Sequence, residues 1–263
     1  MNQLHKSQIR MNKKQILIIG IFSLLLVFMS IFLINTDANE GLYSEIPFIY
    51  NIFNIITQAG SEYFYIIFFA FMYIAWNKEY TQKIMINFTI ITHFTTFFKF
   101  LFQDPRPATN IVDGEEKAEG YGFPSGHTTG TVSVWSLVYL KYNNSEKTKE
   151  KFIFQGIALF FLITVPLSRM IIGVHDLEDV LGGFLLSIFL TLFFILVLPK
   201  MQKFTKKTQW QTEILIFSSI SILFWVISVV ILGLIHPDAW GSQAEGIAQT
   251  GGMFLGLAIG IPL

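Results

Sequence analysis

Long apolar runs separated by short polar segments dominate the pattern of this 263-residue chain. A helix that crosses a bilayer needs about 20 mostly apolar residues, because a hydrocarbon core of roughly 30 Å is crossed at about 1.5 Å per residue. A further apolar segment, residues 46–58, is interrupted by proline and asparagine, so we interpret it as an interfacial segment that leads into the second span. The pattern predicts eight spans, at residues 16–34, 60–76, 84–102, 127–140, 152–172, 178–198, 214–235 and 245–261.

The composition indicates lipid as the solvent for most of the surface. Hydrophobic residues make up 52% of the chain and charged residues 14%, whereas about 25% are charged in an ordinary soluble domain. The 18 basic and 18 acidic residues balance, so no nucleic-acid partner is expected, because binding to a phosphate backbone needs an excess of Lys and Arg. We expect an all-α fold, a polytopic transmembrane helix bundle surrounded by membrane lipids, and leave its oligomeric state open.

The basic residues are concentrated on one side of the predicted spans. If the N-terminus is cytoplasmic, the cytoplasmic segments are residues 1–15, 77–83, 141–151 and 199–213, which hold 14 of the 18 basic residues. Cytoplasmic loops carry an excess of Lys and Arg, so this orientation is the expected one. The first apolar run is long and lacks a good cleavage site, which favours an uncleaved anchor over a signal peptide. The short loops favour a bacterial plasma membrane.

Three of the four remaining basic residues lie at the outer ends of predicted spans. Lys99 lies in an apolar run near the end of the third span, Arg106 follows in Asp-Pro-Arg-Pro, and Arg169 lies at the end of the fifth. A single lysine at such a place can extend its ammonium group to the interface. Three cations at one depth instead predict a shared polyanionic ligand, since unpaired charges there are costly.

Two further motifs supply groups for acid–base and nucleophilic chemistry. Pro124-Ser125-Gly126-His127 opens the fourth span, where free N–H groups can bind an anion and an imidazole can donate a proton to a leaving oxygen. His175 and Asp179 have the i, i+4 spacing that lets a carboxylate accept from one imidazole nitrogen and leave the other as a nucleophile.

The sequence contains no motif for binding a metal or another cofactor. Without cysteine there is no thiolate metal site and no cysteine nucleophile. A P-loop and a His-Glu-x-x-His zinc motif are also absent. We interpret Asp176 and Glu178 as first-turn acids favoured by the helix dipole rather than as metal ligands. No metal and no other cofactor is therefore expected.

His93 lies in the middle of a predicted span. Ionisable residues within a membrane are functional candidates by default. Thr92, Thr95 and Thr96 lie close to His93 in the sequence and are its expected hydrogen-bond partners, so we rank it low as a site residue.

Three separated motifs resemble the signature motifs of the type 2 phosphatidic acid phosphatase family, part of a lipid phosphate phosphatase and haloperoxidase superfamily. The family has a six-helix phosphatase core, which the resemblance implies here together with the N-terminal interfacial segment and two extra C-terminal spans. We therefore expect an anchor span and interfacial segment at 1–59, a lipid phosphatase core at 60–200 and additional helices at 201–263. The motifs are Lys99-x6-Arg106-Pro107, Pro124-Ser125-Gly126-His127 and Ser168-Arg169-x5-His175-x3-Asp179.

The resemblance implies a metal-independent enzyme that hydrolyses lipid phosphates or diphosphates at the non-cytoplasmic face. By the same resemblance His175 attacks phosphorus and forms a phosphohistidine, Asp179 orients it, and His127 transfers the proton. The residues that the resemblance assigns to phosphate binding are Lys99, Arg106, Ser125, Gly126 and Arg169.

Other functions remain open at this stage. A lipid phosphotransferase would pass the phosphoryl group to an acceptor other than water, and a transporter of anions or lipid phosphates would use the three cations as a gate without needing the two histidines. Vanadate-dependent haloperoxidases have a similar site, but they are soluble. Phosphatidic acid, phosphatidylglycerophosphate, undecaprenyl diphosphate and sphingoid-base phosphates all fit the motifs equally well.

Overall fold

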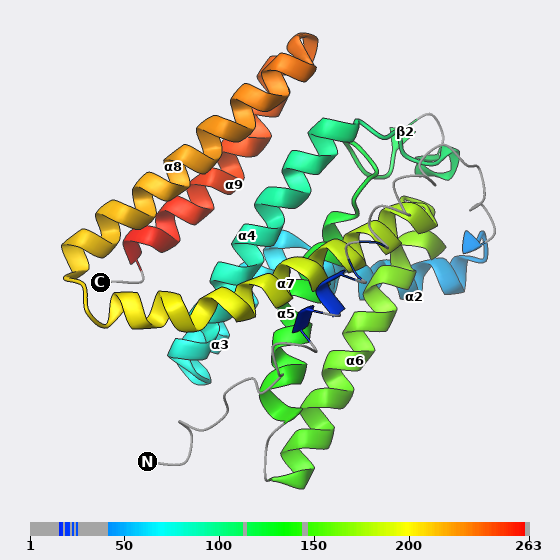
Figure 1. Cartoon of the computed structure of the whole chain (residues 1–263). Coiled ribbons are helices and arrows are strands. Elements are labelled where there is room, and N and C mark those ends of the chain that lie inside the picture. Colours follow the sequence, from blue (N-terminus) through cyan, green and yellow to red (C-terminus); the bar gives the residue numbers. More distant parts are fainter. Residues whose placement is uncertain are drawn as a thin grey trace.

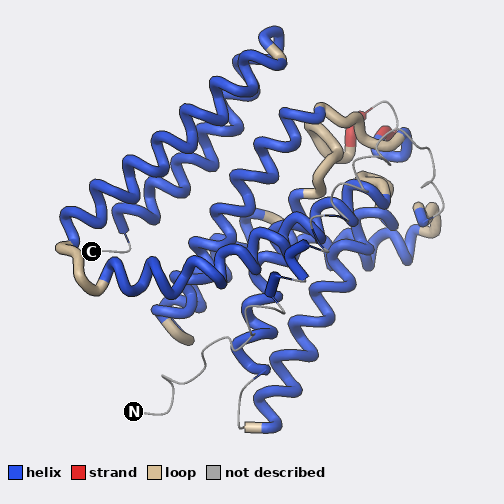
Figure 2. Tube along the Cα trace, in the orientation of Figure 1, coloured by secondary structure: helices blue, strands red, loops and turns tan. Residues whose placement is uncertain are grey.

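The computed structural model describes residues 42–260 apart from 113–114 and 144–146, together with scattered positions between 16 and 25. Most of the predicted first span lies outside the described residues. Helices make up nearly all of the described chain (Figures 1 and 2). In chain order the elements are α2 (Pro47–Thr57), η3 (Gln58–Gly60), α3 (Glu62–Ala75), α4 (Lys78–Phe102), η4 (Ala108–Asn110), β1 (Ile111–Val112), β2 (Glu115–Glu116), α5 (Gly126–Asn143), α6 (Thr148–Ile171), α7 (Leu177–Thr205), α8 (Trp210–Ile235), η5 (Pro237–Ala239) and α9 (Trp240–Gly260).

The expected all-α fold is confirmed, and α3 to α9 correspond to the seven predicted helices after the first. Four described helices, α4, α6, α7 and α8, are long and apolar enough to cross a membrane, and α2 with η3 and α3 forms a fifth candidate bent by 53°. The β structure in the described residues is one antiparallel pair of two-residue strands, β1 and β2, between α4 and α5.

Helix α5 is less apolar than its neighbours because it lies at the centre of the bundle. It packs against α4, α6, α7 and η3, and its first half is rich in small buried residues. Small residues let membrane helices approach closely, and their hydroxyl groups hydrogen bond between helices. The Tyr65 hydroxyl of α3 donates to Thr131 (3.0 Å), and Asn87 of α4 donates to the Ser133 carbonyl (2.9 Å) and to Thr191 of α7 (3.0 Å).

The connections place four helix ends together. The C-terminal ends of α4 and α6 and the N-terminal ends of α5 and α7 meet at one end of the bundle (Figure 1). The Ser125 N–H, just before α5, donates to the Asp179 carbonyl of α7 (2.9 Å). Gly183 of α7 permits this approach, since a Cβ at that position would lie 3.0 Å from the Ser125 carbonyl oxygen.

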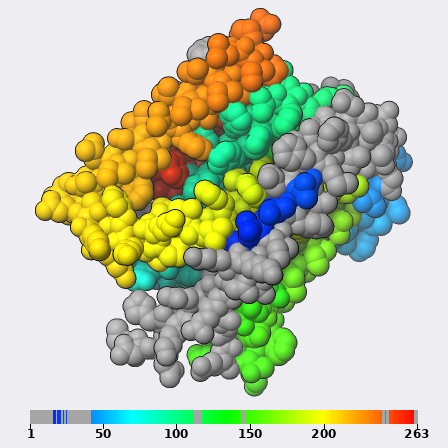
Figure 3. Space-filling model, viewed as in Figure 1, coloured from blue at the N-terminus to red at the C-terminus, as the bar shows by residue number. Residues whose placement is uncertain are grey.

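The last two helices form a hairpin beside α4. Helix α9 packs against both α8 and α4, while α8 lies on the outside of the molecule with part of α9 visible behind it (Figure 3). Only 11% of the most apolar window of α8 is buried, so this helix presents apolar side chains such as Leu215, Leu223 and Leu234 to its surroundings. That surface is typical of a helix in contact with lipid.

His93 joins this hairpin to α4, so its expected partners were wrong. Its Nδ1 lies 3.0 Å from the Thr250 hydroxyl of α9, and its Nε2 lies 3.0 Å from the Ser228 hydroxyl of α8. Thr92 and Thr95 instead donate to carbonyl oxygens of their own helix. A threonine hydroxyl on a helix can donate to a carbonyl oxygen one turn earlier, so it needs no histidine. A buried imidazole between helices instead bonds to the hydroxyl groups of the helices packed against it.

We expect the paired substitution Ser228→Ala and Thr250→Val to weaken docking of the hairpin. Hydrogen bonds between membrane helices contribute about 0.6 kcal/mol each and at most about 1.7 kcal/mol, and both partners of His93 are removed. The unfolding free energy of the purified protein in mixed micelles should fall by about 1–3 kcal/mol.

Ser219→Ala is the matched control. The Ser219 hydroxyl is exposed and bonds only to the Leu215 carbonyl of its own helix. An equal loss of stability in this control and in the paired variant would contradict a docking role for His93.

Candidate active site

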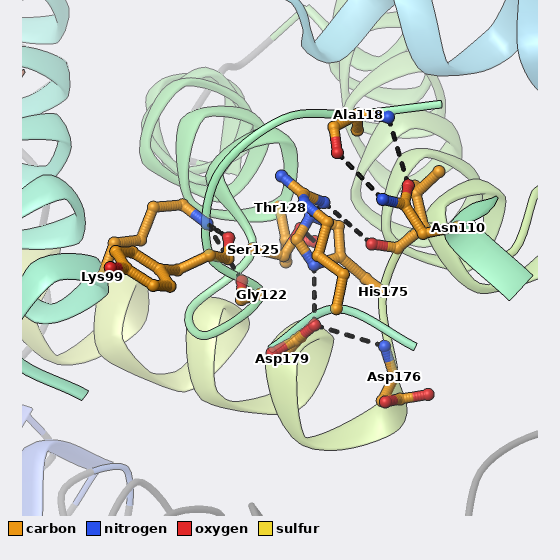
Figure 4. A network of polar contacts seen from close by, with 12 residues as sticks. Lys99, Asn110, Ala118, Gly122, Ser125, Thr128, His175, Asp176 and Asp179 are labelled. Carbon is orange, nitrogen blue, oxygen red and sulfur yellow. Dashed lines mark hydrogen bonds and ion pairs between the residues drawn. The ribbon is translucent and has the colours of Figure 1, made fainter. Parts of the chain in front are cut away.

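The nucleophile–carboxylate pair expected from the sequence is present. The His175 Nδ1–H donates to Asp179 Oδ2 at 2.7 Å, and both side chains are buried. His175 lies in the turn before α7 rather than inside the helix, because Asp176 is the N-cap residue. The Asp176 N–H also donates to Asp179 Oδ2 (3.3 Å), so the carboxylate closes the helix start as well as holding the imidazole (Figure 4).

Arg106 covers the other nitrogen of His175. Its Nη1 donates to His175 Nε2 at 3.1 Å and to the Val174 carbonyl at 2.8 Å. Its remaining donors bond to the carbonyl oxygens of Gly120 (2.9 Å) and Glu119 (2.8 Å). The accepted hydrogen bond places the lone pair on Nε2, and the proton on Nδ1, which is the tautomer that a nucleophilic imidazole requires.

Burial, together with the positive charges of Arg106 and Arg169, holds the pKa of His175 well below its usual range. The imidazole is therefore neutral at neutral pH. A neutral ring with its proton on Nδ1 has a lone pair on Nε2 to give to an electrophile.

Lys99 reaches the same site from the last turn of α4. Its ammonium group donates to the carbonyl oxygens of Tyr121 and Gly122, the latter at 3.0 Å. Gly122 also lies against two carboxyl groups. A Cβ on this residue would lie 2.8 Å from Asp179 Oδ2 and 3.0 Å from Asp104 Oδ2.

Arg169, in the last turn of α6, is held by a residue far away in the sequence. Its Nη1 donates to the hydroxyl of Thr57 at the end of α2 (2.9 Å), and both side chains are buried. Its Nε has no hydrogen-bond partner within the described residues. The sequence contains no signal for Thr57, since the two residues are 112 positions apart.

The start of α5 provides the remaining groups. The Ser125 N–H is used by the Asp179 carbonyl, and the Ser125 hydroxyl accepts from Thr128 (3.1 Å), which leaves the Ser125 O–H to donate to a ligand. A Cβ on Gly126 would meet nothing within 4 Å, so space is open beside this backbone. The charges of Arg169, Arg106 and Lys99 all act on the imidazole of His127 in the first turn.

The structure thus brings the eight residues expected from the three motifs to one end of the bundle. It also shows what holds the segment between α4 and α5 in place. Asn110 exchanges two hydrogen bonds with the Ala118 backbone (2.9 and 3.1 Å), Thr109 donates to the Gly173 carbonyl (2.8 Å), and Lys117 donates to the Ile172 carbonyl (3.1 Å). Short polar residues in a loop carry no spacing signal, so sequence reasoning missed them.

A cavity of about 380 Å³ lies beside Arg106. Pro105, Pro107, Ile111 and Tyr121 are among the residues that line it. No group of three or more His, Asp or Glu side chains in the described part of the chain is arranged to hold a metal ion.

Comparison with known proteins gives consistent matches. Residues 82–203 match the model of the PAP2 superfamily. Rattus norvegicus sphingosine-1-phosphate phosphatase 1 is 26% identical over 82% of this chain and 49% of its own length. Homo sapiens sphingosine-1-phosphate phosphatase 2 is 30% identical over 53% of this chain and 35% of its own length. Bacillus subtilis phosphatidylglycerophosphatase B is 36% identical over 28% of this chain and 37% of its own length. The chain spans about half the length, or less, of these relatives.

One solved structure has the same fold. The crystal structure of the transmembrane PAP2 type phosphatidylglycerolphosphate phosphatase from Bacillus subtilis aligns with a TM-score of 0.54 and 23% sequence identity, covering 71% of this chain and 96% of that one. Together with the apolar helices, this match makes the chain an integral membrane protein.

Gly122→Ala should destabilise the protein. The added methyl group would lie against two buried carboxyl groups, and overpacking of this kind typically costs about 1–3 kcal/mol. We expect a loss of that size in unfolding free energy in mixed micelles. Gly156→Ala on α6, where a Cβ meets nothing within 4 Å, is the control and should be neutral or stabilising. Equal stability of the two variants would contradict the close packing at Gly122.

Proposed function

We propose that this chain, whose residues 82–203 match the model of the PAP2 superfamily, is a membrane phosphatase acting on a lipid phosphate or diphosphate. The observation that carries the proposal is the state of His175. Its Nδ1 proton is held by Asp179 while its Nε2 lone pair faces the cationic group of Arg106. A nucleophile directed at cations is suited to attack on a phosphoryl group that those cations bind.

In the first step the phosphoryl oxygens accept hydrogen bonds from Lys99, Arg106 and Arg169, whose positive charges stabilise the anion. The Ser125 hydroxyl and the open backbone at Gly126 provide further contacts. Arg106 moves a donor from His175 Nε2 to an oxygen of the substrate, which frees the lone pair. Positioning and electrostatic stabilisation of equatorial oxygens are the main sources of catalysis in phosphoryl transfer.

Nε2 then forms a bond to phosphorus as the bond from phosphorus to the leaving oxygen breaks. His127, which takes up a proton when the anionic phosphoryl group binds beside it, gives that proton to the leaving oxygen. The first product is a lipid alcohol, or a lipid monophosphate when the substrate is a diphosphate. Asp179 stabilises the positive charge that develops on the imidazole.

In the second step His127 takes a proton from water, whose oxygen attacks phosphorus and breaks the bond to Nε2. Inorganic phosphate leaves, and His175 returns to its neutral form with its Nδ1–H donating to Asp179. No metal ion takes part in this scheme, because the three protein cations supply the charge that a metal would otherwise provide.

The substrate proposed is a lipid with a terminal phosphoryl group. The names of the relatives point to sphingoid-base phosphates and to phosphatidylglycerophosphate, and the apolar exterior of the bundle suits the lipid chain. The basic residues cluster at the opposite end of α4 to α7 from the site, which supports a site on the non-cytoplasmic face of a bacterial plasma membrane.

His175→Ala should abolish phosphate release from a panel of lipid phosphates in liposomes, since it removes the ring nitrogen whose lone pair faces Arg106. The loss should exceed about 1000-fold, as when the nucleophile of a catalytic triad is removed. Labelling with a radioactive lipid phosphate should give an acid-labile, alkali-stable phosphoprotein in the wild type but not in the variant.

Lys147→Ala is the matched control for this experiment, because Lys147 pairs with Glu150 on the exposed surface. We expect a metal chelator to leave the wild-type rate unchanged. Near-normal turnover by folded His175→Ala would overturn the mechanism. Transfer of phosphate to an added alcohol in place of release would identify a phosphotransferase.

The acid limb of the pH profile should lie below the ordinary pKa of histidine, about 6.5. A lowered pKa keeps His175 neutral, and therefore nucleophilic, as the pH falls through that value. The measurement is kcat/KM against pH, which reports the groups of the free enzyme, after the titration of the substrate phosphate has been divided out. An acid limb with a midpoint at or above 6.5 would contradict the effect of burial on His175.

A further inference from the structure

Asp104 is a buried acid that the mechanism above does not use. It lies just beyond α4 and is 6% exposed. Its carboxyl group is within hydrogen-bonding reach of the Asp179 carboxyl and of the Phe123 backbone. Gly122 lies against both acids, since a Cβ on this residue would lie 2.8 Å from Asp179 Oδ2 and 3.0 Å from Asp104 Oδ2.

Two carboxyl groups this close and this buried share one proton rather than ionising together. Asp179 is the ionised partner, because it accepts the hydrogen bonds that stabilise a carboxylate. Its Oδ2 accepts the His175 Nδ1–H at 2.7 Å and the Asp176 N–H at 3.3 Å. Burial raises the pKa of both carboxyl groups, and the two donors on Asp179 Oδ2 leave Asp104 as the group that carries the proton.

The other oxygen of Asp179 lacks a donor. Asp179 Oδ1 is buried and has no hydrogen-bond partner within the described residues. An unsatisfied buried acceptor typically costs about 1–3 kcal/mol, and more when it is charged. A carboxylic O–H on Asp104 is the donor at hand.

The competing role for Asp104 is that of an ionised partner of Lys99. The ammonium group of Lys99 instead donates to the carbonyl oxygens of Tyr121 and Gly122. Asp104 takes no part in the ion pairs Lys147–Glu150 and His175–Asp179.

We propose that Asp104 is a positioning residue that works in its protonated form, donating a hydrogen bond to Asp179 Oδ1 and so fixing the carboxylate that orients His175. The inference rests on the proposed function, in which His175 is the nucleophile. Asp104 touches neither the substrate nor the reacting atoms, so its loss affects kcat far more than KM.

The proton on Asp104 makes the rate sensitive to alkaline pH. The charged groups that face it are Lys99 from α4 and Asp179 and Glu178 from α7. As the pH rises through the raised pKa of Asp104, the donor is lost and two carboxylates repel each other beside His175.

The test compares Asp104→Asn with Asp104→Ala on a lipid phosphate in liposomes. The amide of the Asn variant donates at every pH, so kcat at neutral pH should stay within about 3-fold of wild type while the alkaline limb moves to higher pH. The Ala variant has no donor, and its kcat should fall about 10- to 100-fold with KM little changed, as expected for a lost hydrogen bond to a charged group.

Asp238→Asn and Asp238→Ala, at an exposed acid in η5, are the matched controls and should leave the profile unchanged. If Asp104→Asn is as slow as Asp104→Ala in folded protein, Asp104 acts as an ion and the proposal is wrong. A wild-type rate and pH profile in Asp104→Ala overturns it equally.

A second measurement does not depend on activity. A carboxyl whose pKa is raised on folding stabilises the folded chain at low pH, and that contribution is lost as the pH rises above the ordinary value of Asp. The unfolding free energy of wild type relative to Asp104→Asn should therefore fall as the pH rises. A flat difference contradicts a protonated Asp104. If this difference in unfolding free energy falls with pH as expected but the wild type releases no phosphate, the proposed function is wrong while the shared proton of the two carboxyl groups is supported.

Discussion

The constraint on which the site depends is the gathering of three cations at one end of a helix bundle. Like charges repel strongly where the dielectric is low, and a buried charge must be paired or hydrogen bonded. Carbonyl oxygens meet this need here, since Lys99 and Arg106 donate to backbone oxygens of residues 119–122 and of Val174. The segment between α4 and α5 is folded so that these oxygens point inward, and the loop is therefore part of the site rather than a cover over it.

The alternating direction of the helices adds a second electrostatic contribution. Helices α4 and α6 end at the site, where the negative end of a helix dipole favours Lys99 and Arg169. Helices α5 and α7 begin there, and the positive ends favour an anionic ligand beside Gly126 and the carboxylate of Asp179. The up-and-down arrangement thus places cations and an anion site side by side, with Lys99, Arg169 and Asp179 each at the helix end whose dipole favours its charge.

Local spacing in the sequence predicted much of the site, whereas contacts between residues far apart in the chain could not be predicted from it. The His175–Asp179 pair follows from four-residue spacing, and the meeting of the motifs follows from the alternation of helices. Thr57, which holds Arg169, and the partners of His93 come from more than 100 positions away, so only the packed bundle shows them. Hydropathy predicted a span at 127–140 but could not show that α5 lies at the centre of the bundle, where a helix surrounded by other helices needs small residues.

Each of the three cations at the site donates to groups of the protein itself, and this bears on selectivity. Arg106 donates to His175, Lys99 donates to two carbonyls, and Arg169 donates to Thr57. Under the proposed function, a substrate must replace several of these bonds at once without leaving a buried donor unpaired. A neutral headgroup has too few acceptors, whereas a phosphoryl group brings several acceptor oxygens and a negative charge that offsets the charge of the three cations. Exchange of partners, rather than the filling of an empty site, would then be what restricts this pocket to phosphorylated lipids.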